Sequence, residues 1–193
     1  MSSSFIVFGN YAPPYSAGWS TRVQTQLRTW LPVLACAMVF AVESTSYLGA
    51  DRTSAPLKRI VEVIFGCDVC VHWGLIHHLI RKTGHFMGYG IYSLVCFRSF
   101  WITFQDVALR LMRQLRAHGL AILATFLVAS ADEYHQSFLP NRTGQFSDVL
   151  LDCCGAVAMG LALFLIMQAV DERRHARSRD VCRIEPAYSS AVA

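Results

Sequence analysis

Four long apolar runs, separated by polar connections, dominate the pattern of this chain. They cover about residues 30–48, 84–104, 119–138 and 149–170. Each run approaches the roughly 20 residues that a helix needs to cross a bilayer. The pattern therefore predicts an all-α integral membrane bundle of four transmembrane helices. A polar cluster ends or begins each run on one side, and Glu43 and Asp152 belong to these polar ends.

The connection 51–83 between the first two runs follows a different pattern. Its apolar positions recur at the spacing of one helix face, at Leu57, Ile60, Val61, Ile64 and Phe65. A second apolar piece, 69–80, is too short to cross a bilayer. We expect one or two short amphipathic helices here, lying on the external membrane surface.

The two ends of the chain are polar. Residues 1–29 lack the basic region and compact apolar core of a signal peptide, so we interpret them as an N-terminal cytoplasmic tail. Residues 171–193 carry five arginines and are expected to form a disordered basic tail. The membrane domain is then 30–170.

Composition agrees with a membrane protein. Of 193 residues, 54% are hydrophobic and only 16% are charged, against roughly a quarter charged in soluble domains. The basic residues form no continuous stripe, so the net charge of +4 does not indicate nucleic-acid binding. Most Lys and Arg residues lie in the two tails and after the second run, which places both termini in the cytoplasm.

This orientation brings the polar ends of the runs to the outer leaflet. On the second run, Lys82, His85 and Tyr89 share one helix face, and on the third run Asp132 and Gln136 do the same. A charge within hydrocarbon costs about 2.5–3.5 kcal/mol on insertion scales, so such groups are expected to pair or to serve a function. The clustering predicts one charge-balanced site.

The residue types in this cluster suit an anionic head group. Arg81, Lys82 and Arg142 would hold a phosphate, because guanidinium binds it bidentately and ammonium binds it as a point charge. His85 and Glu133 are the candidate acid and base. The other candidate ligand-binding residues, which would position the cations or orient the bound group, are Tyr89, Asp132, Gln136 and Asp148.

A metal site is a weaker interpretation of the same residues. His85, Glu133, His135 and Asp148 are suitable ligand types, but their spacing matches no compact motif and three positive charges oppose a cation. We expect no metal and no cofactor. Cys67 and Cys70 form a single CxxC, which leaves open two ordinary cysteines, a disulfide or a metal clip.

Two segments carry a resemblance to a known family. The sequences RKTGHFMGYGIYSL, from Arg81, and DEYHQSFLPNRTGQFSDVLLDCCGAVAMG, from Asp132, resemble the VanZ-like family of small bacterial membrane proteins. The resemblance implies a four-helix, multi-pass protein of the bacterial cytoplasmic membrane, and its named member is associated with teicoplanin resistance. It supplies no reaction. The family-like positions are Arg81, Lys82, His85, Tyr89, Asp132, Glu133, Gln136, Arg142 and Asp148.

Two functions remain open from the sequence. In the first, the cluster binds or acts on an anionic lipid or lipid-linked envelope precursor. In the second, the protein is a non-catalytic structural envelope factor whose cluster only locks the helices together. A transporter or channel is disfavoured, because the charges collect at one end of the bundle and no inverted repeat is visible. The sequence indicates neither a reaction nor an oligomeric state.

Overall fold

The fold is all helical in the part of the chain that the computed structural model describes, residues 19–45, 50–66, 71–139 and 144–191. The helices are α1 (Trp19–Glu43), α2 (Ala50–Phe65), α3 (Trp73–Thr103), α4 (Arg110–Gln136) and α5 (Phe146–Ala191). Side chains are described for residues 23–45, 52–66, 71–139 and 144–177.

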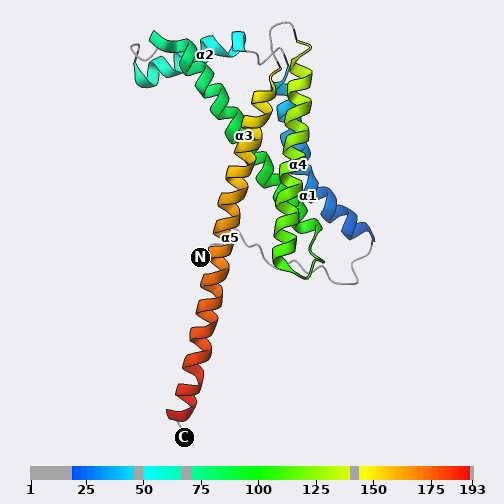
Figure 1. Ribbon diagram of the computed structural model, residues 1–193, viewed down its shortest axis with the longest axis vertical. Coiled ribbons are helices and arrows are strands. Elements are labelled where there is room, and N and C mark those ends of the chain that lie inside the picture. The colour runs from blue at the N-terminus through cyan, green and yellow to red at the C-terminus, as the bar shows by residue number, and fades with distance from the viewer. Residues whose placement is uncertain (1–18, 46–49, 67–70, 140–143, 192–193) are drawn as a thin grey trace.

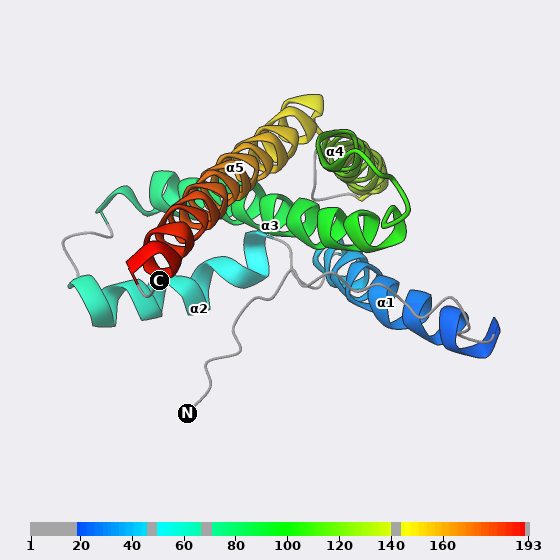
Figure 2. The ribbon, with the colours of Figure 1, turned by 90° about the horizontal axis from the view of Figure 1, so that it is seen from below.

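α3 is the central helix of the bundle. It contacts α1, α2, α4 and α5, whereas α1 meets α4 at few positions. In Figure 1, α1 and α4 run in one direction, α3 and α5 run in the other, and α2 lies across one end. Figure 2 shows α3 between α1 and α2 on one side and α4 and α5 on the other. This position lets α3 present side chains to every other helix.

The second half of the connection 51–83 differs from the expected short surface helix. Residues 73–83 continue without interruption into the predicted span 84–104, so that both belong to α3. Gly84 is the one glycine at this junction, and a Cβ there would meet nothing within 4 Å. A single helical glycine costs only about 1 kcal/mol, so the helix passes through it.

Three helices are long and apolar enough to cross a membrane among the residues that the structure describes. They are Val23–Glu43, Arg110–Gln136 and Phe146–Arg177. These correspond to the first, third and fourth predicted spans. The second predicted span, within α3, does not meet this criterion. It follows Arg81 and Lys82 and contains Arg98, and its crossing of the membrane stays a prediction.

Several boundaries differ from those expected. α1 begins at Trp19, inside the expected N-terminal tail, and ends at Glu43, before the expected residue 48. Ser44 and Thr45 follow the helix. Their hydroxyl groups can form hydrogen bonds with the backbone that compete with helical ones, and the Thr45 hydroxyl donates such a bond to Val42 O at 2.6 Å. α4 begins at Arg110, not at 119, because 110–118 is rich in helix formers.

The basic C-terminal segment also differs from its expectation as a disordered tail. α5 continues through Ala191 and so includes most of residues 171–193. An ion pair at 2.8 Å between Arg110 Nη2 and Asp171 Oδ2 ties this part of α5 to the start of α4. The residues that follow Asp171 include several good helix formers, which allow α5 to continue.

The core lies where α1, α3, α4 and α5 meet. Its buried residues are Val33, Tyr92, Cys96, Phe97, Ala117, Ala121 and Met167. Many large apolar side chains instead point outward, including Leu31, Leu34 and Met38 on α1. A contiguous apolar exterior is typical of a surface that faces lipid, so these exposed side chains agree with the membrane character of the bundle.

α3 and α5 approach closely at a pair of glycines. A Cβ on Gly155 would lie 2.1 Å from Phe86 O, and a Cβ on Gly90 would lie 3.0 Å from Gly155 O. Gly88 of the same helix faces α1 instead, where a Cβ would lie 3.4 Å from the ring of Phe40. The crossing at Gly155 sets His85 of α3 beside Asp152 of α5.

Candidate functional site

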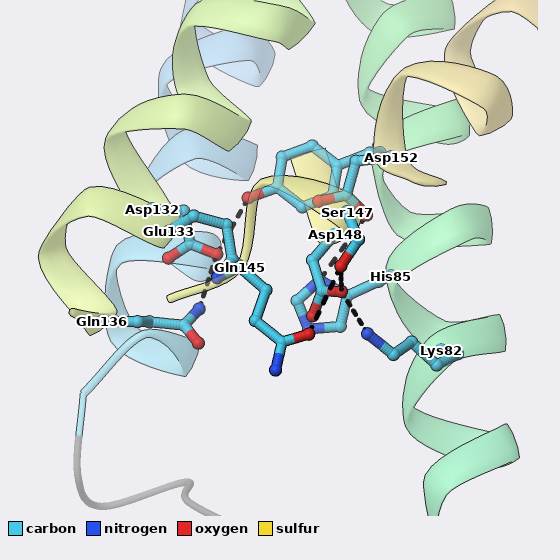
Figure 3. A network of polar contacts seen from close by, with 10 residues as sticks. Lys82, His85, Asp132, Glu133, Gln136, Gln145, Ser147, Asp148 and Asp152 are labelled. Carbon is cyan, nitrogen blue, oxygen red and sulfur yellow. Dashed lines mark hydrogen bonds and ion pairs between the residues drawn. The ribbon is translucent and has the colours of Figure 1, made fainter. Parts of the chain in front are cut away.

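The polar ends of α3, α4 and α5 converge at one end of the bundle. Figure 3 shows residues from these three helices, and from the segment before α5, directed toward a shared space. Lys82 and His85 come from α3, whereas Asp132, Glu133 and Gln136 come from α4. The clustering that helix spacing predicted is therefore present among the described residues.

Two contacts join α3 to α5. Lys82 Nζ pairs with Asp148 Oδ1 in the first turn of α5, with both side chains partly exposed. One turn deeper, His85 Nδ1 lies 3.6 Å from Asp152 Oδ1, beyond normal hydrogen-bond distance. Neither Asp152 oxygen has a hydrogen-bond partner among the described residues, and its side chain is fully buried. A protonated His85 would place a positive charge beside this carboxylate, which has no other partner among the described residues.

Asp132 links α3 and α4. Its Oδ2 atom accepts a hydrogen bond from the Tyr89 hydroxyl at 3.1 Å and another from Gln136 Nε2 at 3.0 Å. Its Oδ1 atom is buried without a hydrogen-bond partner in the described part of the chain. The Tyr89 ring stacks on Phe40 of α1, with centroids 4.3 Å apart. Tyr89 is thus fixed at both its ring and its hydroxyl.

Glu133 has a different environment. Its side chain is buried, and Oε2 accepts a hydrogen bond from the backbone N–H of Gln145 at 2.8 Å. At the preceding residue, a Cβ on Gly144 would lie 2.2 Å from Glu133 O. Glu133 therefore holds the segment that enters α5 tightly against the end of α4.

A cavity of about 380 Å³ lies beside this network, between α1, α2, α3 and α4. Its lining residues are Val39, Phe40, Glu43, Thr53, Arg81, Gly84, His85, Gly88, Tyr89, Asp132 and Gln136. This volume is within the usual range for small-molecule sites, about 300–1,000 Å³. Arg81 has no ion-pair or hydrogen-bond partner among the described residues, so its guanidinium is available to a ligand.

The structure separates the residues proposed from the sequence into three groups. Arg81, His85, Tyr89, Asp132 and Gln136 line the cavity. Lys82, Asp148 and Glu133 lie next to the cavity and are engaged with protein partners. Arg142, Cys67 and Cys70 lie outside the described residues.

Sequence reasoning missed the contributions of the first two helices. Phe40 and Thr53 line the cavity, but nothing in their local sequence marks them. Glu43 was recognised as an intramembrane carboxylate without being assigned to the site. Gly84 and Gly88, four residues apart on α3, also line the cavity. The spacing of these glycines could have indicated the cavity, because a missing side chain leaves space for a ligand as readily as for another helix.

No group of three or more His, Cys, Asp or Glu side chains able to hold a metal ion is found among the described residues. His135, a ligand in the weaker metal interpretation, is exposed and contacts Ser44 Oγ through Nδ1 at 2.9 Å. This contact joins α4 to the end of α1.

Comparison with known families gives a match over most of the chain. The family model described as VanZ/LLP1 matches residues 6–168, which include every cavity-lining residue. The match confirms the resemblance drawn from the two segments that begin at Arg81 and Asp132. No curated protein and no solved structure gives a significant match.

Proposed function

This chain belongs to the VanZ/LLP1 family, and we propose that it binds the anionic head group of a membrane lipid or lipid-linked envelope precursor in the cavity beside α3. The observation that carries the proposal is Arg81, a cation that lines a cavity and has no partner in the described part of the chain. An Arg in this position suits phosphate, which it binds through two parallel N–H···O bonds.

The depth of the cavity supports a lipid ligand. Arg81 precedes the stretch 83–97 of α3, which contains no Asp, Glu, Lys or Arg. A cation at such a boundary lies at the level of head groups when the apolar stretch is in the bilayer. We place this end at the outer leaflet of the bacterial cytoplasmic membrane, following the charge distribution. Engagement of an envelope precursor there would connect the family to glycopeptide resistance.

Residues around the cavity take distinct roles in this proposal. Arg81 holds the anion, and Tyr89 and Gln136 orient it from α3 and α4. His85 is the imidazole that lines the cavity, with the carboxylate of Asp152 behind it. His85 is therefore our candidate for proton exchange with the ligand.

The test compares two arginines of the same helix. We expect purified Arg81→Ala protein to bind a polyprenyl phosphate, or an anionic phospholipid, about 10- to 100-fold more weakly than the parent, because charge-assisted hydrogen bonds are worth about 1.5–3 kcal/mol. Arg98→Ala is the matched control, since Arg98 is exposed and does not line the cavity. Equal affinities for the parent and Arg81→Ala would refute the proposal.

A second candidate function, that of a structural envelope factor, rests on the contacts that lock the helices. Glu133 binds Gln145 N, and Lys82 pairs with Asp148, so these residues hold α3, α4 and α5 in register. The variants His85→Asn and Glu133→Gln separate the two functions. Their thermal stability, their abundance and the glycopeptide resistance that they confer are measured. A site predicts that His85→Asn loses the phenotype while keeping abundance and stability. A purely structural cluster predicts loss of abundance in both variants.

A further inference from the structure

Asp152 is a fully buried carboxyl group without a hydrogen bond. Its exposed fraction is 0%, and neither of its oxygens has a hydrogen-bond partner among the described residues. Burial of a carboxylate is costly, and replacing a buried charged pair by apolar side chains of similar volume is often neutral or stabilising. Stability alone therefore does not explain why an aspartate stands at this position of α5.

The group that faces Asp152 has the same unmet need. His85 Nδ1 is buried without a hydrogen-bond partner in the described part of the chain, and it lies 3.6 Å from Asp152 Oδ1. The two neighbouring carboxylates of α4, Asp132 and Glu133, accept hydrogen bonds from other groups. His85 and Asp152 can therefore satisfy each other, and hydrogen bonds at binding sites are often long until the ligand is in place.

A hydrogen bond between these two groups determines which ring nitrogen exchanges protons. A neutral imidazole carries one proton, and the hydrogen bond that one nitrogen makes decides where that proton resides. A carboxylate only accepts, so a neutral ring beside Asp152 keeps its proton on Nδ1. The ring then gains and loses its second proton at Nε2. Because Nδ1 is buried and the ring lines the cavity, Nε2 is the nitrogen that a ligand can reach.

We infer that Asp152 is the positioning residue of His85, which holds the Nδ1 proton and directs Nε2 at the ligand. Asp152 acts through the imidazole and does not itself touch the ligand, since its side chain is fully buried. The role of Nε2 toward a ligand rests on the proposed function, because it concerns the head group bound in the same cavity. The Nδ1 proton, in contrast, depends on the two helices α3 and α5 alone.

The tautomer of His85 tests the inference without a ligand. The full chain is labelled with ¹⁵N-histidine and purified in detergent, and two-bond ¹⁵N–¹H correlations are recorded by NMR at a pH at which the ring is neutral. The signals that are lost in His85→Asn assign the ring. We expect the proton on Nδ1 and a bare Nε2. A proton on Nε2 in the parent protein would overturn the inference.

Variants on α5 test the part played by Asp152. Asp152→Leu removes the acceptor, so we expect the form protonated on Nε2 to replace the form protonated on Nδ1. Its midpoint of thermal unfolding should stay the same or rise, because a buried carboxyl group without hydrogen bonds is removed. Asp171→Asn is the matched control, since Asp171 lies on the same helix and pairs with Arg110 instead.

A structural role would give a different result. It predicts that Asp152→Leu lowers the midpoint of unfolding and leaves the His85 tautomer as in the parent, and this outcome would overturn the inference. If Asp152→Leu does not fold, the tautomer of the parent protein still decides between the two roles.

Titration with a polyprenyl phosphate separates this inference from the proposed function. We expect the Nε2 signal of His85 to move as the ligand binds, and Asp152→Leu to bind about 2- to 10-fold more weakly, as for the loss of one hydrogen bond. A ligand that binds without moving the Nε2 signal would overturn the inference and leave the proposed function standing. If Arg81→Ala binds as tightly as the parent, the proposed function fails, whereas the tautomer still decides the role of Asp152.

Discussion

Gly155 determines how closely α3 and α5 approach at the level of the site. The atom that a Cβ would meet at 2.1 Å is a backbone oxygen, Phe86 O, which cannot move aside as a flexible side chain would. Separation of the two helices would also separate His85 from Asp152 and Lys82 from Asp148. The absence of a side chain at Gly155 therefore allows the close helix approach on which both contacts depend.

We expect Gly155→Ala to destabilise the protein by about 1–3 kcal/mol, because an added methyl group overpacks the helix crossing. Gly119→Ala is the matched control, since Gly119 also lies within a helix and a Cβ there meets nothing within 4 Å. That substitution should be neutral or stabilise by up to about 1 kcal/mol through helix propensity. Unfolding of both variants in detergent checks the pair, and equal stabilities would contradict the close crossing.

At the scale of elements, three polar contacts set the register of the helices. Lys82–Asp148 joins α3 to α5, Tyr89–Asp132 joins α3 to α4, and Ser44–His135 joins α1 to α4. Asp148 also lies in the first turn of α5, where a negative charge interacts favourably with the helix dipole. The pair and the dipole both stabilise this end of α5, so single substitutions cannot separate them.

A double-mutant cycle with Lys82→Ala and Asp148→Ala isolates the pair. We expect a coupling free energy of about 1 kcal/mol, because the side chains are 29% and 21% exposed and incompletely screened by solvent. Lys58–Glu62 on α2, at 3.7 Å and with exposures of 43% and 33%, is the comparison and should couple by no more than about 0.5 kcal/mol. Coupling no larger at Lys82–Asp148 than at Lys58–Glu62 would show that this contact does not hold α3 and α5 together.

At the scale of the whole molecule, α3 decides the topology. Three helices qualify as membrane spans among the described residues, and an odd number of crossings would leave the two ends of the chain on opposite sides. In the bundle, α3 runs antiparallel to α4 and crosses α5, and it contacts both helices (Figure 1). Surrounded by other helices, α3 has less need of an apolar surface than the helices that it contacts.

We therefore expect α3 to cross the membrane. Alkaline phosphatase fused after Phe65, before α3, should be active outside the cytoplasmic membrane, and the same enzyme fused after Asp106, beyond α3, should be inactive. The two fusion points flank α3, so each serves as the control for the other. Activity at both points would mean that α3 does not cross and that the termini face opposite sides.

The sequence by itself determined the features that depend on local pattern. Apolar runs predicted helices and the membrane environment, and helix spacing placed Lys82 with His85 and Asp132 with Gln136 on shared faces. The order of charged and glycine residues also carried the family resemblance that the match over residues 6–168 confirms. These properties could be predicted because each depends on residues within a few turns of one another.

Only the tertiary structure decided which faces meet. The crossing at Gly155 and the placing of Phe40 and Thr53 at the cavity depend on helix rotation and tilt. Those quantities follow from packing between segments distant in the sequence, where several small-residue pairs compete as contact points. Sequence spacing thus indicated a charged cluster, whereas packing left Arg81 facing a cavity and engaged Lys82 and Glu133 with protein partners.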